Sequence, residues 1–318
     1  MKPAPFEYHR PASLAETFDL LDRYGDDGRI LAGGQSLVPA LNLRLATPRA
    51  VIDINRIPDL DAIRVTGEGL VIGALVRQEA LERSPLVREH APLIAAAVPH
   101  VGHSAIRARG TIGGSLALAD PAAELPACAV ALGATIRAGR RGGSRDIEAA
   151  DFFRGVYTTA LAPGEIVTEI LVPRPAAGWR WAFEELARRH GDFALAGLAA
   201  GVRLAGRDAA VAGRGAAVAG RGEPEASRAD RGIEPSEYIV AEVRLVFFGV
   251  GTRPVRARRA EAALAGRRAD AEALAAAGRA LDGDLDPPGD VHGSPALRRH
   301  LARVLLSRVV GRLVEARP

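Results

Sequence analysis

Residues 30–39 read ILAGGQSLVP and place two adjacent glycines between apolar segments. Ile30 and Leu31 are typical of a short buried strand, and the apolar residues from Leu37 onward favour a short helix. Glycine reaches positive φ angles and lacks a Cβ atom, so the backbone N–H groups of such a turn can converge on an anion. The stretch therefore predicts a strand-to-helix turn that can hold a phosphate. A tight structural connection without a ligand is the alternative for one Gly–Gly pair.

A second glycine pair with similar neighbours follows about 80 residues later. Here Thr111 precedes Gly113 and Gly114, and Ser115 follows them. We expect a strand-like segment to lead into this turn and a helix to follow it. Two turns of matching chemistry favour a diphosphate ligand, with one phosphate at each turn.

Other phosphate-binding patterns are absent. No G-x-G-x-x-G follows a predicted strand, and the only lysine is Lys2, which excludes a P-loop. The sequence therefore argues against a nucleotide triphosphatase.

Composition indicates a globular protein of two or three domains, since the 318 residues are 48% hydrophobic and 25% charged. No apolar run is long enough to cross a bilayer and the N-terminus lacks a signal-peptide pattern, so we expect a cytoplasmic protein without a transmembrane segment. Cys128 is the single cysteine, so any iron–sulfur cluster would belong to a partner. The net charge of +4 comes from scattered arginines, and aromatic residues make up only 4%, which disfavours nucleic-acid binding.

Local patterns predict an α+β fold. A helix should begin after the N-cap Ser13 and end at Gly25, a hairpin should cover residues 63–76, and a helix with Pro85 in its first turn should cover 84–101. A strand at 165–173 should close the first domain. Beyond it we expect strands at 179–204 and 238–251, and then helices at 256–267, 269–283 and 294–316, the last with Ser294 as N-cap.

A low-complexity insert interrupts this second domain at about residues 206–236. The motif AAVAGRG occurs there twice in tandem, at 209–215 and 216–222. Such a segment lacks a core-forming pattern, and we expect a hairpin extension or a disordered loop.

Four separated motifs together resemble one family. They are AGGQSLVP (32–39), RARGTIGGSLALADPAAELPA (107–127), FEELARRHGDFALAG (183–197) and DPPGDVHGSPALRRHLARVL (286–305). They resemble, in the same order, the FAD-binding medium subunit of molybdenum hydroxylases, a family that includes aerobic carbon monoxide dehydrogenase and xanthine dehydrogenase. The resemblance covers the whole chain except the insert.

The resemblance implies an oxidoreductase subunit built from two domains. Residues 1–176 would form an FAD-binding domain of the vanillyl-alcohol-oxidase (PCMH) type, with two α+β halves that grip the dinucleotide, and residues 177–318 a smaller domain of antiparallel sheet plus helices. FAD would bind non-covalently. A large subunit with the molybdenum cofactor and a small subunit with [2Fe–2S] centres would be the partners, and electrons would leave for NAD, a quinone or another acceptor.

Several residues acquire expected roles from this resemblance, and none of them is a catalytic acid, base or metal ligand. The expected FAD contacts are Ala32, Gly33, Gly34, Gln35, Ser36 and Leu37 at the diphosphate; Thr111, Gly113, Gly114 and Ser115 at the second turn; Glu124 at the FAD hydroxyls; and Asp192, Phe193 and Ile166 or Val167 near the isoalloxazine.

The chain departs from the family pattern at three places. Gln35 stands where His is frequent, Ser115 where Asn is frequent, and Glu184 or Glu185 where Lys is frequent. The first two changes keep hydrogen-bonding groups, whereas the loss of a cation would stabilise the reduced anionic flavin less. A standalone FAD oxidase on the same fold and a scaffold subunit that has lost FAD are the alternatives. His100 and His103 have no third ligand at a convincing spacing, so we expect no metal site.

Overall fold

The structure is a computed structural model that describes residues 2–206 and 238–315. The predicted low-complexity insert lies almost entirely outside the described residues. None of the helices within the described ranges combines the length and apolar character needed to cross a membrane.

The N-terminal part is built on a three-stranded parallel sheet in the order β1 (Glu7–His9), β3 (Ala50–Asp53), β2 (Gly28–Leu31). Helix α1 (Leu14–Tyr24) starts as predicted, because the Ser13 hydroxyl accepts a hydrogen bond from the N–H of Glu16 at 3.2 Å. Gly25 ends it with a φ of 49°, before a short 3₁₀ turn, η1 (Gly25–Asp27). Helix α2 (Leu37–Asn42) follows the first glycine turn, which we define as residues 32–36.

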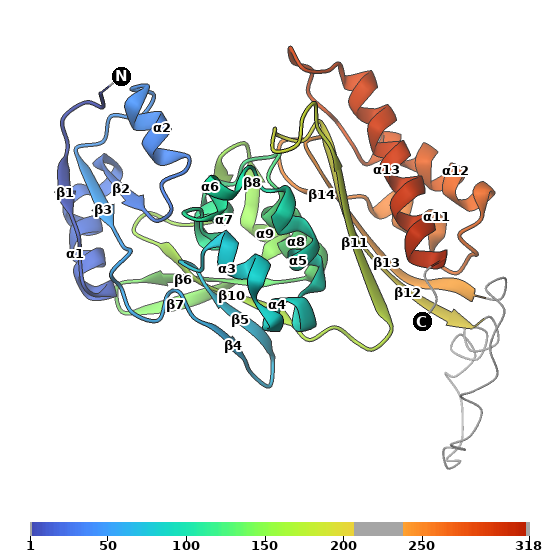
Figure 1. The fold of residues 1–318 in the computed structure, drawn as a ribbon, viewed down its shortest axis with the longest axis horizontal. Coiled ribbons are helices and arrows are strands. Elements are labelled where there is room, and N and C mark those ends of the chain that lie inside the picture. The colour runs from blue at the N-terminus through green and yellow to red at the C-terminus, as the bar shows by residue number, and fades with distance from the viewer. Residues whose placement is uncertain (1, 207–237, 316–318) are drawn as a thin grey trace.

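The middle part carries a five-stranded antiparallel sheet. Its order is β4 (Ile63–Val65), β5 (Gly69–Gly73), β10 (Ile166–Pro173), β6 (Thr135–Arg140), β7 (Gly143–Glu148). Helices lie over one face of it (Figure 1): α3 (Gln78–Arg83), α4 (Pro85–His90), α5 (Pro92–Ala97), α6 (Ser104–Arg107), α7 (Ile112–Leu118) and α8 (Glu124–Leu132), with the 3₁₀ turn η2 (Val98–His100). Helix α9 (Ala149–Phe152) leads into the small hairpin β8 (Phe153–Gly155) and β9 (Thr158–Thr159).

The C-terminal part is a four-stranded antiparallel sheet in the order β11 (Trp179–Leu186), β12 (Ala196–Gly206), β13 (Tyr238–Phe248), β14 (Val255–Arg256). Helices α11 (Arg258–Leu264), α12 (Ala271–Ala280) and α13 (Pro295–Glu315), with the turn η4 (Leu281–Gly283), cover one face (Figure 1). Helix α8 packs against the other face, where Phe183 and Phe248 join its core. The predicted α+β class, with an antiparallel sheet plus helices at the C-terminal end, is confirmed.

Two local predictions are wrong. The helix predicted over 84–101 breaks at Pro92, because proline has no N–H to continue the ladder, and the chain restarts as α5. The segment before the second glycine pair is helix α6 rather than a strand, and Gly113 and Gly114 lie inside the first turn of α7. Thr111 caps that helix, since its hydroxyl accepts a hydrogen bond from the N–H of Gly114 at 3.1 Å.

Arg298 of α13 holds together the segments that flank β12 and β13 within the C-terminal part. Its guanidinium donates to the carbonyl oxygens of Leu195 and Gly249 and to the Asp290 carboxylate, each at 2.7 Å. The side chain is 7% exposed, and the N–H of Gly249 donates to Pro121 just before α8 at 2.8 Å. One buried cation therefore fixes the ends of β12 and β13 beside the first domain.

We predict that Arg298→Met lowers the free energy of unfolding by about 3 kcal/mol, because it leaves two carbonyl oxygens without their charged donor. Denaturant unfolding would measure it. Arg299→Met is the matched control, because its side chain is 35% exposed and its Asp286 partner is fully exposed. A loss no larger than that of the control would contradict this role of Arg298.

Candidate functional site

The first glycine turn presents unused backbone donors. Within the described residues, the N–H groups of residues 33 to 36 donate no hydrogen bond. The neighbouring carbonyl oxygens are engaged: Ala32 accepts from Asn55 Nδ2 at 2.8 Å, Gly33 from Gln35 Nε2 at 3.1 Å, and Gly34 from the N–H of Val38 at 3.0 Å. Four free donors beside satisfied acceptors are the groups that an anion-binding turn requires.

Both residues of the first pair must be glycine, for different reasons. Gly34 has a φ of +73°, which side-chain-bearing residues rarely adopt. A Cβ at position 33 would lie 2.5 Å from the carbonyl oxygen of Arg109 and 2.8 Å from the Cα of Gly110. The first turn therefore packs directly against the segment that leads to the second turn.

The second glycine turn, residues 111–115, uses its donors internally. The N–H groups of Ile112 and Gly113 donate to Val76 and Ala74, and those of Gly114 and Ser115 donate to Thr111. A Cβ at position 113 would lie 2.5 Å from the Cβ of Ala74. This pair of glycines thus allows α7 to pack closely, and the free donors expected at both turns are concentrated at the first.

The residues expected near the flavin ring are divided between surface and core. Phe193 is 74% exposed and Asp192 is exposed, on the loop between β11 and β12. Gly191 of that loop packs against His103 at the start of α6, so the loop lies beside the segment leading to the second turn. Ile166 and Val167 are instead buried at the start of β10, opposite Gly139 and Ala138 of β6.

Two carboxyl groups meet where the domains join. Burial, together with the nearby Glu124 carboxylate, raises the pKa of Glu185 to about 8, and burial raises that of Glu124 to about 7. Glu185 Oε1 lies 3.7 Å from His100 Nδ1, while its buried Oε2 has no hydrogen-bond partner. Burial and the nearby His190 lower the pKa of His100. Glu185 is therefore mostly neutral at pH 7 and lies beside the His100 imidazole.

Sequence reasoning missed three polar residues beside these segments. Asn55 binds the backbone of the first glycine turn at Ala32, and Arg77 binds the backbone at Arg109, two residues before the second turn. Tyr157 is 62% exposed with a φ of 51°, and its hydroxyl donates to Asp120 at 3.4 Å in the ADPAAE segment. No motif contains these three residues, so their placement depends on the tertiary fold.

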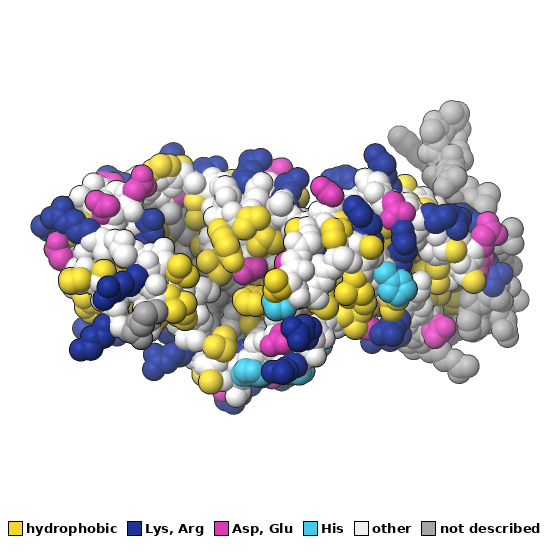
Figure 2. All heavy atoms as spheres, turned by 90° about the horizontal axis from the view of Figure 1, so that it is seen from above, with side chains coloured by type: hydrophobic (Ala, Val, Ile, Leu, Met, Phe, Trp, Pro, Cys, Tyr) yellow, Lys and Arg dark blue, Asp and Glu magenta, His cyan; other side chains and the backbone are white. Residues whose placement is uncertain are grey.

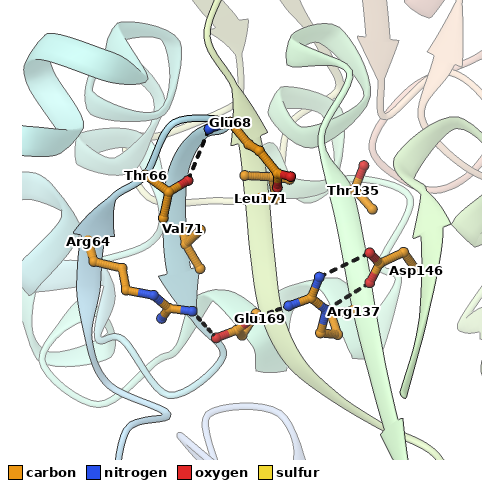
Figure 3. A pocket seen from close by; sticks show the side chains of 9 residues that line it. All are labelled: Arg64, Thr66, Glu68, Val71, Thr135, Arg137, Asp146, Glu169 and Leu171. Carbon is orange, nitrogen blue, oxygen red and sulfur yellow. Dashed lines mark hydrogen bonds and ion pairs between the residues drawn. The ribbon is translucent and has the colours of Figure 1, made fainter. Parts of the chain in front are cut away.

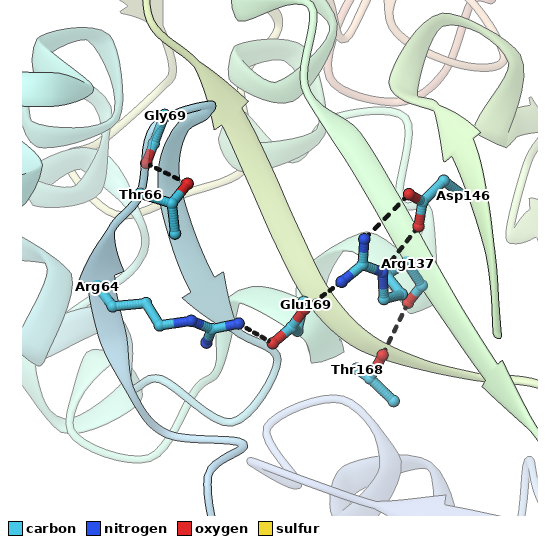
Figure 4. A network of polar contacts seen from close by, with 7 residues as sticks. All are labelled: Arg64, Thr66, Gly69, Arg137, Asp146, Thr168 and Glu169. Carbon is cyan, nitrogen blue, oxygen red and sulfur yellow. Dashed lines mark hydrogen bonds and ion pairs between the residues drawn. The ribbon is translucent and has the colours of Figure 1, made fainter. Parts of the chain in front are cut away.

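An open hollow of about 360 Å³ lies on the uncovered face of the five-stranded sheet. Figure 3 shows its lining, and Figure 4 shows an ion-pair chain across the sheet from Arg64 to Glu169, Arg137 and Asp146. Every charge in this chain is paired, and the remaining charged side chain of the lining, Glu68, is an anion, so the hollow offers no unmatched cation to an anionic ligand. The glycine turns are the better candidate site.

Known protein families match both parts of the chain. Residues 4–175 match the family described as FAD binding domain in molybdopterin dehydrogenase, and residues 181–313 match the CO dehydrogenase flavoprotein C-terminal domain. The chain belongs to this family of FAD-binding medium subunits of molybdenum hydroxylases, which are oxidoreductases.

Individual relatives are similar to this chain over nearly its full length. The chain is 36% identical to the 6-hydroxypseudooxynicotine dehydrogenase complex subunit alpha of Paenarthrobacter nicotinovorans, covering 100% of this chain and 98% of the relative. It is 34% identical to the carbon monoxide dehydrogenase medium chain of Hydrogenophaga pseudoflava, covering 98% and 97%. A solved carbon monoxide dehydrogenase from that organism superposes with a TM-score of 0.85 at 36% identity over 98% of each chain. Quinoline 2-oxidoreductase from Pseudomonas putida 86 gives 0.84 at 34% identity over 99% of each chain.

We predict that stability falls between about pH 5 and about pH 8, because the folded protein retains a proton on Glu185 that the unfolded chain has released. Glu185→Gln keeps the size and shape of the side chain but has no ionisable group. Its free energy of unfolding should exceed that of wild type at pH 8 by on the order of 2 kcal/mol, with little difference at pH 5. Denaturant unfolding at several pH values would measure the difference.

Glu184→Gln is the matched control on the same strand. Its carboxylate pairs with Arg308 and Arg312 of α13. Its replacement should therefore lower the free energy of unfolding by a similar amount at each pH between 5 and 8. Parallel curves for wild type and Glu185→Gln would show that Glu185 is ionised in the folded protein.

Proposed function

We propose that this chain is the electron-transfer FAD subunit of a molybdenum hydroxylase complex. In this proposal, electrons from [2Fe–2S] centres on a small partner subunit reach FAD here and leave for an external acceptor such as NAD or a quinone. A large partner subunit would hold the molybdenum cofactor and the substrate. The four free N–H donors of the first glycine turn carry the proposal for this chain, because they fit the diphosphate of a dinucleotide.

We assign the FAD contacts in three groups. Ala32 to Leu37 would hold the diphosphate, and Thr111, Gly113, Gly114 and Ser115 would form the wall behind it. Glu124 would bind FAD hydroxyls, and Phe193, Asp192 and Ile166 would lie on the isoalloxazine side. Bound FAD supplies the redox chemistry, and the residues of this chain bind and orient it.

The proposed domain arrangement rests on the same family membership. Residues 1–176 would form a PCMH-type FAD-binding domain and residues 177–318 the C-terminal flavoprotein domain. Among the described residues the connection between β10 and β11 spans the boundary.

The acid pair bears on the flavin environment. Glu184 or Glu185 stands in place of the frequent lysine, and an ionised Glu185 would place a negative charge at this junction. Because the pKa of Glu185 is about 8, the group is mostly neutral at pH 7. The substitution therefore removes a cation without adding a full negative charge.

Gly33→Ala should lower the FAD affinity at least tenfold, because the added Cβ would force the first turn away from Arg109 and so disturb the four donors. The FAD content per chain would be measured from the flavin absorbance at about 450 nm, and the affinity from titration of the apoprotein with FAD.

Gly67→Ala is the matched control, since a Cβ there would meet no atom within 4 Å. The proposed site is wrong if the folded Gly33→Ala protein takes up FAD with wild-type affinity.

A further inference from the structure

A chain of polar contacts runs from the N-terminal sheet to the second glycine turn through side chains outside every motif. The Tyr8 hydroxyl donates to Asp53 Oδ2, and Asp53 Oδ1 accepts from the backbone N–H of Asn55 at 2.9 Å and from Asn55 Nδ2 at 2.6 Å. Asn55 Oδ1 accepts from Arg77 Nη2 at 2.6 Å, and Arg77 Nη1 donates to the carbonyl oxygen of Arg109. These contacts connect two parts of the chain that share no β-sheet.

Asn55 acts on the first turn from the end of β3. Its Nδ2 donates to the carbonyl oxygen of Ala32 at 2.8 Å, immediately before Gly33. Asp53 holds the same amide group, which fixes its orientation. A carbonyl held in this way leaves the following N–H groups in a defined arrangement.

Arg77 acts on the other side of the same contact. It pairs with Thr111 in an isolated β-bridge, and its guanidinium holds the Arg109 carbonyl against which Gly33 packs. Arg77 Nη2 therefore binds Asn55, which holds the first glycine turn, and Arg77 Nη1 binds the Arg109 carbonyl, which precedes the second. A planar guanidinium with two separated donors suits this bridging role better than a single ammonium.

We propose that Asn55 and Arg77 are positioning residues that clamp the first glycine turn against the second segment and so set the affinity for the diphosphate. This inference rests on the proposed FAD function. Without the clamp, residues 32–36 would have to be ordered when the ligand binds, and the entropy of that ordering would reduce the affinity.

The clamp lies outside the main cores. Asn55 and Arg77 are both half-buried, and neither belongs to a hydrophobic cluster. Their truncation should thus lower ligand affinity more than it lowers the stability of the fold.

The test compares Arg77→Met, Arg77→Lys and Asn55→Ala with the control Arg83→Met, whose exposed side chain pairs only with Glu79 on the same helix. Titration of each apoprotein gives the Kd for FAD, and competition gives the Kd for ADP, a probe that carries the diphosphate without the flavin. Thermal unfolding without ligand reports the fold.

We expect Arg77→Met and Asn55→Ala to raise the Kd of FAD and of ADP by a similar factor, between about 10 and about 100. Arg77→Lys should give a smaller increase, since one ammonium replaces only part of the bridge. The two truncations combined should weaken binding by less than the product of their separate factors, because each breaks the same connection.

The outcomes separate this inference from the proposed function. Wild-type Kd values for Arg77→Met and Asn55→Ala, with FAD binding lost in Gly33→Ala, would overturn the clamp and leave the FAD site in place. A raised Kd for FAD with an unchanged Kd for ADP would also overturn the clamp, since the clamp acts at the diphosphate. Normal FAD binding by folded Gly33→Ala would instead overturn the proposed site itself.

Discussion

The close contact between Gly33 and the backbone of Arg109 and Gly110 is the constraint on which the rest of the site depends. It brings a turn from the parallel N-terminal sheet against a segment from the antiparallel middle part. Gly110 faces a side chain on its other side, since a Cβ there would lie 2.4 Å from Gln78 Oε1. A backbone-to-backbone contact of this kind tolerates no side chain, and it leaves the N–H groups of the first turn free on the remaining side.

Helix α8 makes the corresponding connection between the two domains. It is buried along nearly its whole length, with core contacts to the middle helices and to the C-terminal sheet. Its first residue, Glu124, lies near Glu185 of β11, so the join between domains contains an acid pair that is neutral in part at pH 7. Figure 2 shows apolar side chains gathered on the face above this middle region, among scattered charged groups.

Much of the local structure follows from the sequence, because its causes are local. The Ser13 cap, the end of α1 at Gly25 and the Ser294 cap of α13 each depend on residues within one helical turn. The prediction of a strand before Gly113 was wrong because the same residues form α6, whose environment is set by distant segments. Asn55 and Arg77 could not be found in the sequence for a similar reason, since their partners at Ala32 and Arg109 are 23 and 32 positions away.

The distribution of charge supports the proposal that backbone groups hold the diphosphate. Almost all cations of this chain are arginines, and several are paired with carboxylates or carbonyl oxygens, among them Arg64 and Arg137 of the middle sheet and Arg298 and Arg303 of α13. Arg77 is itself bound to Asn55 and to a backbone carbonyl, and burial lowers its pKa. A cation already engaged in this way can hold a loop in place, but it has few donors left for a ligand. In the proposed site the diphosphate would be bound largely by the N–H groups of residues 33 to 36, whose arrangement depends on the surrounding side chains.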